Sequence, residues 1–371
     1  MKICFITSST ITRHATMKRA FGMANPLTEQ GHQVTIVLQD SIDNRKAMEY
    51  CPGTKAFYYQ AGSANYERAQ KRKFLKESFF DVIHICGLGW RNALHLKSSS
   101  STFTIMDHVE LESSLSGISY LRRLLQFVLE AWSLLAYDGS VLASKYLEFL
   151  FRRRLHRLGK KRQLLYLPYA YDPQRLALDP RKVDILHDSY PDHKLVIYMG
   201  GIYRNYGCFE ILDALSILIK ECQNIKVIFI GRGPDKEEAM QYAINLDINS
   251  FVEFKGYLHE DEIPTYLYGA DVLLSPLHDT ITDWARCPSK LLMYMATQKP
   301  IVTCCIGEAR EYLDSDGFYY EPNSPSSLAY TILRALSQGE SGWFPSYDIN
   351  SHTWDTRVKA WVKWIEKCQF R

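Results

Sequence analysis

A lysine occupies an electrostatically unusual position in "ARCPSKLLMYMATQKPIV", residues 285–302. Pro288 and Ser289 open a helix that we expect to run to about Thr297, because Pro fits a first turn and Ser can cap it. Lys290 then lies in the first turn, where the positive end of the helix dipole disfavours a cation by up to about 1 kcal/mol. A bound anion would compensate this cost, although a surface lysine also tolerates it.

Three further segments place glycines directly after predicted strands. They are "YMGGIYRNYG" with Gly200, Gly201 and then Arg204, "FIGRGPDKEE" with Gly231 and Gly233, and "FKGYLHEDEIPTYL" with Gly256 and Tyr257. Glycines let backbone amides approach a ligand, and the helix that follows presents its positive end. Each loop alone is also an ordinary turn. Together with Arg204 and Lys290, the loops predict an anion site that suits a diphosphate, with Tyr257 available to a flat base.

These segments belong to a regular alternation of short apolar runs and longer amphipathic stretches, which is typical of parallel βαβ units. The expected strands are "KICFIT", "GHQVTIVL", "FFDVIHICG", "STFTIMDH", "YDGSVLAS" and "LLYLPYAYD" in the first half, and "KLVIYMGG", "IKVIFIGRG", "FVEFKG", "ADVLLSP", "KPIVTCC" and "GFYYE" in the second. A charged, Pro- and Asp-rich stretch at 172–193 is the expected linker. We therefore predict two α/β domains whose sites lie beyond the carboxyl ends of the strands.

The composition is that of a globular protein and limits the possible partners. The 371 residues are 46% apolar and 23% charged with a net charge of +3, which gives no support for a nucleic-acid partner. Nine scattered cysteines without a CxxC pair argue against a disulfide framework or a zinc site and favour a reducing compartment. The start, "MKICFITSS", is typical of a first strand, and there is no apolar run long enough to span a membrane. We expect a cytoplasmic protein.

The ordered set of motifs resembles GT-B fold glycosyltransferases of the family 4 type. The matching series is "YMGG…RNYG", "VIFIGRGP", "VEFKGYLHEDEIPTYLYGADVLLSPL" and "PSKLLMYMATQKPIV", preceded by "EQGHQVTIV", "FDVIH", "DGSVLAS" and "LPYAYD". The resemblance covers most of the chain. It implies two Rossmann-like domains facing across a cleft, 1–171 for the acceptor and 190–349 for the donor. The C-terminal helix at about 350–371 is expected to cross back to the first domain.

The resemblance also implies the chemistry: a nucleotide-diphosphate sugar as co-substrate, transfer with retention of configuration, and neither a metal nor another cofactor. The implied donor-binding residues are Gly200, Gly201, Gly231, Gly233, Gly256, Tyr257, Pro288, Ser289 and Met293. Arg204 and Lys290 would stabilise the departing diphosphate. In "TIMDHVELESS", His108 is expected near the reacting carbon, with His84 as the alternative, although its apolar strand favours a core position. The acceptor would meet Thr10, Arg13, His14 and Glu110, unless Glu110 only caps the next helix.

Two positions depart from the family pattern. Its two glutamates, eight residues apart, fall on Ala285 and Met293, and the second is expected to hold the donor ribose. A thioether accepts hydrogen bonds weakly, so donor binding is expected to lose roughly 1.5–3 kcal/mol for each charge-assisted hydrogen bond that is missing. Asp283, two residues before Ala285, is a candidate substitute for the first glutamate. Three explanations remain: a different ribose contact, an engineered or inactivating change, or a non-catalytic relative. The first loop also lacks glycine before Gly22, so side chains crowd the acceptor side.

A basic and aromatic segment at 149–171 contains seven Lys and Arg and no Asp or Glu, and "KRKFLK" adds four cations at 71–76. Upstream, "YLRRLLQFVLEAWSLLAY" is apolar except for residues that fall roughly on one helical face. The segment is either a solvated face of a buried helix, a surface for anionic lipid, or a nucleic-acid site without a recognised motif. A lipid-linked acceptor would suit a protein peripheral to the inner face of the membrane.

The resemblance therefore predicts a glycosyltransferase that moves a sugar to a saccharide or lipid-linked acceptor in cell-surface polysaccharide synthesis. A nucleotide-sugar isomerising relative and a catalytically degenerate subunit that supports an active partner are the alternatives. Measuring the release of nucleotide diphosphate with and without an acceptor distinguishes the transferase, the isomerising relative and the non-catalytic subunit.

Overall fold

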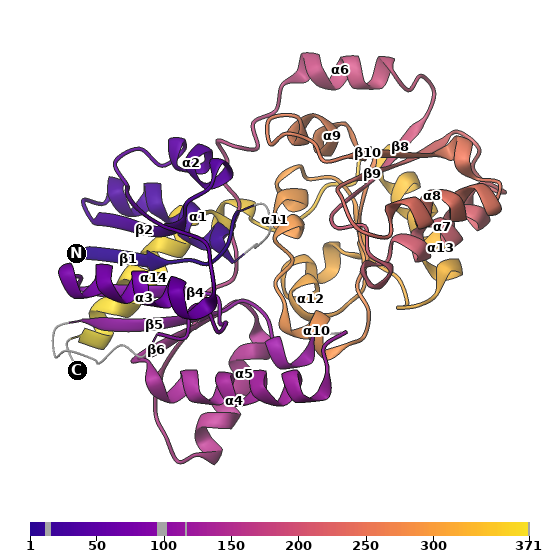
Figure 1. The fold of residues 1–371 in the computed structure, drawn as a ribbon. Coiled ribbons are helices and arrows are strands. Elements are labelled where there is room, and N and C mark those ends of the chain that lie inside the picture. The colour runs from indigo at the N-terminus through magenta and orange to yellow at the C-terminus, as the bar shows by residue number, and fades with distance from the viewer. Residues whose placement is uncertain (12–15, 95–101, 116, 370–371) are drawn as a thin grey trace. The chain divides into compact units, whose positions relative to one another are not determined.

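The computed structural model describes residues 1–11, 16–94, 102–115 and 117–369, and the chain forms two compact units (Figure 1). Unit 1 comprises Met1–Ala170, Trp284–Cys287 and His352–Arg371, and unit 2 comprises Tyr171–Asp283 and Pro288–Ser351. Each unit has one parallel sheet covered by helices, so the predicted α/β class is confirmed. Among the described residues, no helix combines the length and the apolar character needed to cross a bilayer.

Unit 1 contains a seven-stranded sheet in the order β3-β2-β1-β4-β5-β6-β7, with every neighbouring pair parallel. The strands are β1 (Lys2–Ile6), β2 (Gln33–Gln39), β3 (Lys55–Tyr59), β4 (Val82–Cys86), β5 (Phe103–His108), β6 (Gly139–Leu142) and β7 (Gln163–Tyr166). The order reverses between β1 and β4, and ligands of such sheets bind beyond the carboxyl ends at this switch point.

The helices of unit 1 are α1 (Met17–Glu29), α2 (Ile42–Glu49), α3 (Ala64–Glu77), α4 (Tyr120–Ala136), α5 (Lys145–Arg157) and α14 (Trp354–Gln369). Four of them begin after a serine whose side chain accepts a hydrogen bond from a first-turn amide; these caps are Ser41, Ser63, Ser119 and Ser144. Such a cap satisfies an amide that has no partner inside the helix and stabilises the helix by about 1 kcal/mol. The starts of these helices are therefore encoded locally.

Helix α14 belongs to unit 1, as predicted for the C-terminal helix. The Trp361 ring is fully buried and stacks on His84 with a centroid distance of 6.0 Å. Near the start of α14, the Trp354 ring lies directly on Gly22 of α1, where any Cβ would overlap it. In Figure 1 the yellow α14 lies among the indigo elements of unit 1. Helix α14 thus packs against the sheet and the first helix of unit 1.

Unit 2 contains a six-stranded parallel sheet in the order β10-β9-β8-β11-β12-β13. The strands are β8 (Lys194–Met199), β9 (Ile225–Ile230), β10 (Val252–Gly256), β11 (Val272–Ser275), β12 (Ile301–Thr303) and β13 (Phe318–Tyr319). The helices are α6 (Pro180–Asp188), α7 (Cys208–Leu218), α8 (Lys236–Asn245), α9 (Ile263–Gly269), α10 (Ile281–Ala285, which ends in unit 1), α11 (Ser289–Ala296), α12 (Gly307–Leu313) and α13 (Pro325–Glu340). All six strands predicted for the second half are present.

The segment predicted to be a linker, residues 172–193, is not one in the structure. Residues 172–193 contain helix α6, which lies within unit 2. The His187 ring bonds with Nε2 to the carbonyl of Gly269 at 2.9 Å and so ties α6 to the end of α9. The stretch looked like a linker because Pro and Asp are frequent there, but Asp179 and Pro180 instead cap and open this helix.

Candidate functional site

The three glycine loops of unit 2 lie side by side at the carboxyl ends of β8, β9 and β10. The amide of Ile202 donates to the carbonyl of Arg232 at 2.9 Å, which joins the first loop to the second. The amide of Gly231 donates to the carbonyl of Gly256 at 2.7 Å, which joins the second loop to the third. The loops therefore continue the sheet's hydrogen bonding beyond the strands and form one connected rim.

Close contact between these loops explains two of the glycines. A Cβ on Gly231 would lie less than 3.0 Å from the carbonyl oxygen of Gly200, and one on Gly233 equally close to that of Ile202. Gly231 also has a φ of 144°, which side-chain-bearing residues rarely adopt. Gly256 has a φ of 75° but open space around it. Packing of backbone on backbone is thus sufficient to require Gly231 and Gly233, whether or not a ligand also approaches them.

Lys290 lies against the first of these loops. Helix α11 begins at Ser289, and Pro288 precedes it without a side-chain cap, so the capping role expected of Ser289 is not observed. The Lys290 ammonium stands 4.3 Å from the centre of the Tyr198 ring and 3.5 Å from the position a Cβ on Gly200 would take. The hydroxyl of Tyr198 donates to the carbonyl of Gly201 at 2.9 Å. A cation, a glycine loop and a helix start therefore meet, as the anion-site prediction requires.

A second tyrosine fixes α11 to the end of β8. The buried hydroxyl of Tyr294 accepts a hydrogen bond from the amide of Met199 at 2.8 Å. Leu291, Leu292 and Met295 are buried with it, whereas Lys290 and Met293 are only half-buried. Lys290 and Met293 are three residues apart and therefore neighbours on one helix face. Tyr198 and Tyr294 were not predicted as site residues, because an aromatic residue next to a loop usually belongs to the hydrophobic core.

Arg204 is engaged differently from Lys290. Its backbone amide donates to Oδ2 of Asp235 at 2.7 Å, and its guanidinium forms an ion pair with Glu238. The guanidinium also lies 4.0 Å from the centre of the Phe209 ring, and the side chain is 62% exposed. Its charge is already balanced in this structure, so the expected cradle of two cations around one diphosphate requires Arg204 to leave Glu238.

Arg232 is a cation of the second loop that the sequence analysis overlooked, although it stands between the two glycines of "GRG". Its guanidinium carbon lies 4.7 Å from the centre of the Tyr257 ring, which is 52% exposed. The pair joins the second and third loops through side chains. Arg232 is therefore a further candidate for contact with an anionic ligand.

Asp283 has a local structural role that explains it without a ligand. Its carboxylate accepts a hydrogen bond from the amide of His278 at 2.8 Å, while its own amide donates to the hydroxyl of Thr280 at 3.2 Å. The Thr280 hydroxyl thus caps the start of α10, and the Asp283 carboxylate holds the turn that precedes it. Ala285, where the family pattern has the first glutamate, is fully buried, and its carbonyl accepts from the Ser144 hydroxyl at 2.7 Å.

In unit 1, a fully buried ion pair stands at the end of β5. The Arg19 guanidinium donates to Asp107 at 2.6 Å and to the carbonyl of Leu167 at 2.7 Å. Burial raises the pKa of Asp107, but the charge of Arg19 and the contacts with Arg19 and His84 together outweigh it and leave the pKa below its usual value. Burial lowers the pKa of His84, whose ring lies 3.8 Å from Asp107. His84 is a core residue, as its apolar strand indicated.

One group of side chains among the described residues has the composition of a metal site: His84, Cys86 and Asp107, with ligand atoms within 4.8 Å of one another. The Arg19 guanidinium already contacts this carboxylate and brings a positive charge into the same space. A second cation there would be repelled. We therefore assign the group to the core of unit 1.

His108 does not face an opening, which corrects its expected position. It is 1% exposed, with Nε2 3.3 Å from the Ser133 hydroxyl and its ring edge-on to Phe151 at a centroid distance of 4.6 Å. Burial lowers the pKa of His108 to about 3, so the ring is neutral at neutral pH. The strand-end position was predicted correctly, but α4 and α5 cover the ring. A role at the reacting carbon would require α4 to move.

Glu110 and Glu112 follow β5 in a carboxylate-rich loop. Burial raises the pKa of Glu110, and the Arg286 guanidinium partly opposes this. Burial, Glu110 and Glu130 raise the pKa of Glu112 to about 8, so that carboxyl retains a proton at neutral pH. Half-buried carboxyls with raised pKa values are candidates for proton exchange with a ligand hydroxyl, and Glu110 stays a predicted acceptor contact.

The loop after β1 holds the remaining acceptor candidates. Ser9 has a φ of 66°, and the half-buried Thr10 follows it. The Asn44 side chain donates to the carbonyl of Ser9 at 3.1 Å and accepts from the amide of Ile11 at 2.9 Å, so it holds the loop from both sides. Arg13 and His14 lie outside the described residues.

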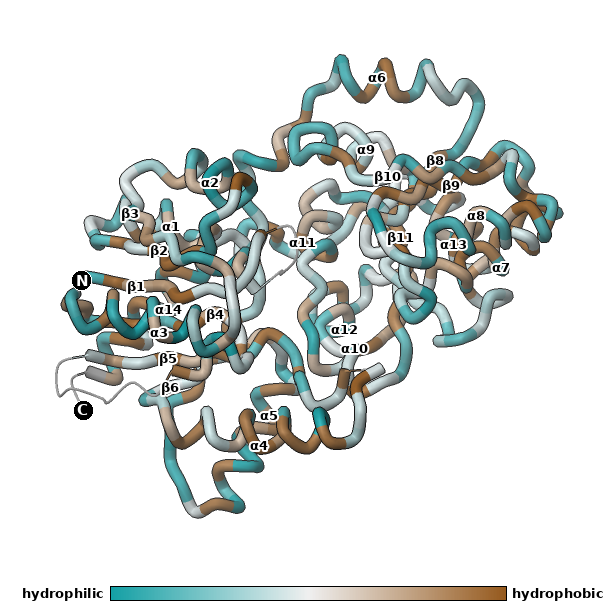
Figure 2. Tube along the Cα trace, in the orientation of Figure 1, coloured by the Kyte–Doolittle hydropathy of each residue, from teal (hydrophilic) through white to brown (hydrophobic). Residues whose placement is uncertain are grey.

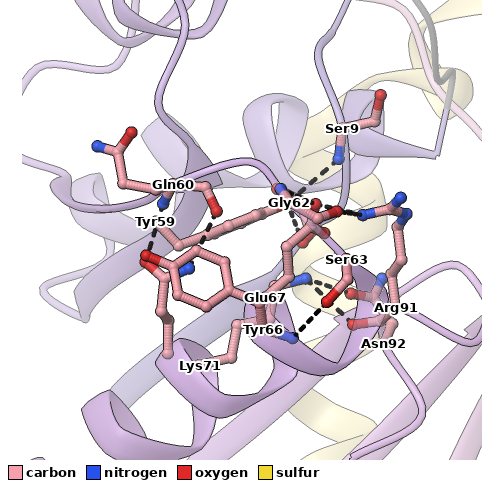
Figure 3. A network of polar contacts seen from close by, with 12 residues as sticks. Ser9, Tyr59, Gln60, Gly62, Ser63, Tyr66, Glu67, Lys71, Arg91 and Asn92 are labelled. Carbon is pink, nitrogen blue, oxygen red and sulfur yellow. Dashed lines mark hydrogen bonds and ion pairs between the residues drawn. The ribbon is translucent and has the colours of Figure 1, made fainter.

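A second polar network stands at the carboxyl ends of β3 and β4 (Figure 3). Glu67 is buried on α3 and forms an ion pair with Arg91. Lys71, one turn further, donates to Asn92 at 2.8 Å and lies 4.4 Å from the centre of the Tyr59 ring. Burial lowers the pKa of Lys71 to about 7. Lys71 was expected on a basic surface, and its burial corrects that expectation.

Comparison with known proteins finds similarity to glycosyltransferases over part of the chain. Residues 193–338 match the family model described as "Glycosyl transferases group 1". The amylovoran biosynthesis glycosyltransferase AmsK of Erwinia amylovora is 27% identical over 176 residues, which cover 46% of this chain and 43% of that protein. Spore coat protein SA of Bacillus subtilis is 22% identical over 334 residues, which cover 85% of this chain and 83% of that protein. The chain thus spans less than half of the first relative.

Solved structures show the same fold over the whole chain. HepE of Anabaena in complex with UDP-glucose has a TM-score of 0.72 at 13% identity, covering 100% of this chain and 97% of that one. A TarM mutant of S. aureus in complex with fondaparinux, alpha-GlcNAc-glycerol and UDP has a TM-score of 0.74 at 9% identity, covering 98% and 100%. At these identities the likeness concerns the fold.

These matches confirm the predicted resemblance. The chain has the GT-B fold, built from the two parallel sheets described above. Residues 193–338 of unit 2 match the group 1 glycosyltransferase model, and the similar proteins include one named for amylovoran biosynthesis.

Proposed function

We propose that the protein transfers a sugar from a nucleotide-diphosphate sugar to a saccharide or lipid-linked acceptor in cell-surface polysaccharide synthesis. The carrying observation is the position of Lys290, in the first turn of α11 and against the Gly200 loop, within the matched segment. HepE and TarM were solved with UDP, which supports a nucleoside diphosphate as the anion. Retention of configuration and independence of metal are parts of the proposal.

In this mechanism the protein holds the diphosphate and stabilises the charge that develops as the sugar departs. The Lys290 ammonium and the amides of the glycine loops supply that stabilisation. Arg204 joins them on exchanging Glu238 for phosphate, and Arg232 stands on the neighbouring loop. Met293, one turn from Lys290, contacts the nucleoside. The ribose hydroxyls then form their hydrogen bonds with another residue.

The test is titration of the full chain with UDP, GDP and ADP, followed by assay of diphosphate release from the matching nucleotide sugars. Lys290→Ala should weaken diphosphate binding about tenfold or more, the effect of losing one charge-assisted hydrogen bond. Lys182→Ala is the matched control, because Lys182 is an exposed lysine in the first turn of another helix of unit 2. Equal weakening in both variants, or no diphosphate binding by the wild type, would refute the donor site.

The same assay separates the alternatives. Diphosphate release that needs an acceptor supports transfer, and conversion of the nucleotide sugar without release supports an isomerising relative. Binding without turnover supports a subunit that assists an active partner.

A further inference from the structure

Helix α4 of unit 1 packs with its polar face inward. Glu130 is 1% exposed and accepts hydrogen bonds from the Ser113 amide and from Arg154 of α5, both at 2.8 Å. Ser133 is fully buried and contacts His108. The polar residues of α4 thus find their partners inside the protein. A buried helix with a solvated charged face was one of the three alternatives considered for this region, and α4 has the opposite orientation.

The apolar face of α4 is consequently exposed. Its exposed side chains are Tyr120 at 82%, Leu121 at 66%, Leu124 at 49%, Leu125 at 60%, Phe127 at 47% and Val128 at 56%. At 100° per residue they fall within one continuous arc of the helix, which Leu135 extends by two turns. Figure 2 shows this run in brown along α4. Soluble surfaces rarely expose a contiguous apolar patch of this kind unless something apolar covers it.

Positive charge surrounds this apolar face. Arg122 and Arg123 are exposed in the first turn of α4. The Arg154 guanidinium lies 4.9 Å from the centre of the Phe127 ring, so α5 with its exposed Arg153 and Arg157 lies next to α4. At the other end of α4, the exposed Arg162 donates to the carbonyl of Leu135 at 2.8 Å. Glu130 is the one acidic residue of α4, and it is buried and paired.

A hollow opens on the same face. It has a volume of about 250 Å³ and is lined by Ser113, Tyr120, Arg123, Leu124 and Phe127. One of its walls is therefore cationic and the others are mostly apolar. This combination suits a group with an anionic head and a hydrocarbon tail.

We propose that α4 lies flat on an anionic lipid bilayer. Its exposed leucines, Tyr120 and Phe127 enter the boundary between headgroups and acyl chains, while the surrounding arginines contact phosphates. Exposed apolar area and positive charge occur together here, and lipid is the partner that matches both. The sequence placed possible lipid binding at 149–171. In the structure the apolar contact is made by α4, and the basic residues of 149–171 add positive charge beside it. The inference does not depend on the transferase proposal.

The test is co-sedimentation of the full chain with vesicles of phosphatidylcholine alone or with about a third phosphatidylglycerol, at low and high salt. The wild type should bind the anionic vesicles, and salt should weaken binding. Leu121→Gln/Leu125→Gln should reduce partitioning about tenfold or more, because binding scales with buried apolar area. Arg122→Gln/Arg123→Gln should reduce it about fivefold per arginine at low salt and little at high salt.

Matched controls are Ile185→Gln, an exposed apolar residue on α6, and Lys359→Gln/Lys363→Gln, two exposed cations on α14. These variants should bind as the wild type does. The leucine variants replace exposed side chains, so circular dichroism should show unchanged folding. Failure of the wild type to bind anionic vesicles, or unchanged binding by the leucine variant, would overturn the proposal. A dimer in light scattering that the leucine changes dissociate would also overturn it, because α4 would then cover a second copy.

Discussion

Gly233 and Gly256 separate two reasons for which a protein needs glycine. A Cβ on Gly233 would lie less than 3.0 Å from the carbonyl oxygen of Ile202, which is backbone, and no positive φ applies there. Gly256 has a φ of 75°, and nothing lies within 4 Å of the position that an added Cβ would take. Gly233→Ala therefore tests steric overlap alone, and Gly256→Ala tests backbone conformation alone.

The expected magnitudes differ. Alanine at a left-handed position costs about 1–2 kcal/mol, and the stiffer unfolded chain returns about 0.4–1 kcal/mol, so Gly256→Ala should lower stability by about 1 kcal/mol. Gly233→Ala must displace the Ile202 loop, at about 1–3 kcal/mol for overpacking. It also strains the hydrogen bond from the Ile202 amide to Arg232, worth about 1 kcal/mol. We expect a loss of about 2–4 kcal/mol.

The measurement must report on unit 2 alone, because the chain contains two units that need not unfold together. Hydrogen exchange followed by mass spectrometry on peptides from β8 and β9 provides this readout. Gly233→Ala should also weaken binding of nucleoside diphosphate, since it moves the loop beside Lys290, whereas Gly256→Ala should weaken it less. If Gly233→Ala costs no more stability than Gly256→Ala, the loop-packing explanation is wrong.

Three further outcomes are expected. Met293→Glu should tighten nucleoside diphosphate binding in calorimetry if a carboxylate there reaches the ribose, and unchanged affinity would place the ribose elsewhere. Because the pKa of Glu112 is raised to about 8, the folded state retains a proton that the unfolded state releases above its ordinary pKa of 4.5, so stability should fall as pH rises between these values. Urea unfolding across that window should show a smaller fall for Glu112→Gln, and parallel curves would contradict the assignment. Arg19→Met should destabilise unit 1 by about 3–5 kcal/mol in exchange experiments, because it leaves the Asp107 carboxylate buried without its partner; a loss under about 1 kcal/mol would show that Asp107 takes up a proton instead.

Much of the sheet architecture could be predicted because it is encoded locally. Apolar runs marked every strand of unit 2. The serine caps of unit 1 are equally local signals, but the prediction did not use them. Strand β3 was missed: "KAFYY" is short and its first residues are exposed. The other edge strands, β7, β10 and β13, were predicted from their apolar runs, so an edge position alone does not hide a strand.

The candidate site was predicted in part. The glycine loops and Lys290 do adjoin, because parallel strands bring their carboxyl ends to one edge. The ion pair of Arg204 with Glu238 and the burial of His108 could not be foreseen, since each depends on residues distant in sequence. The same holds for α4. Its periodicity showed two faces, but only the distant partner Arg154 determines which face turns inward.

The position of α14 bears on how the chain folds during synthesis. This helix covers the first sheet through Trp361 and Trp354, yet the ribosome makes it only after all of unit 2. Until then the nascent amino-terminal unit exposes an apolar sheet face, and nascent chains in that condition are prone to aggregate. The two units thus differ during synthesis: the second can fold once its own strands have emerged, whereas the first is completed only after α14 has been made.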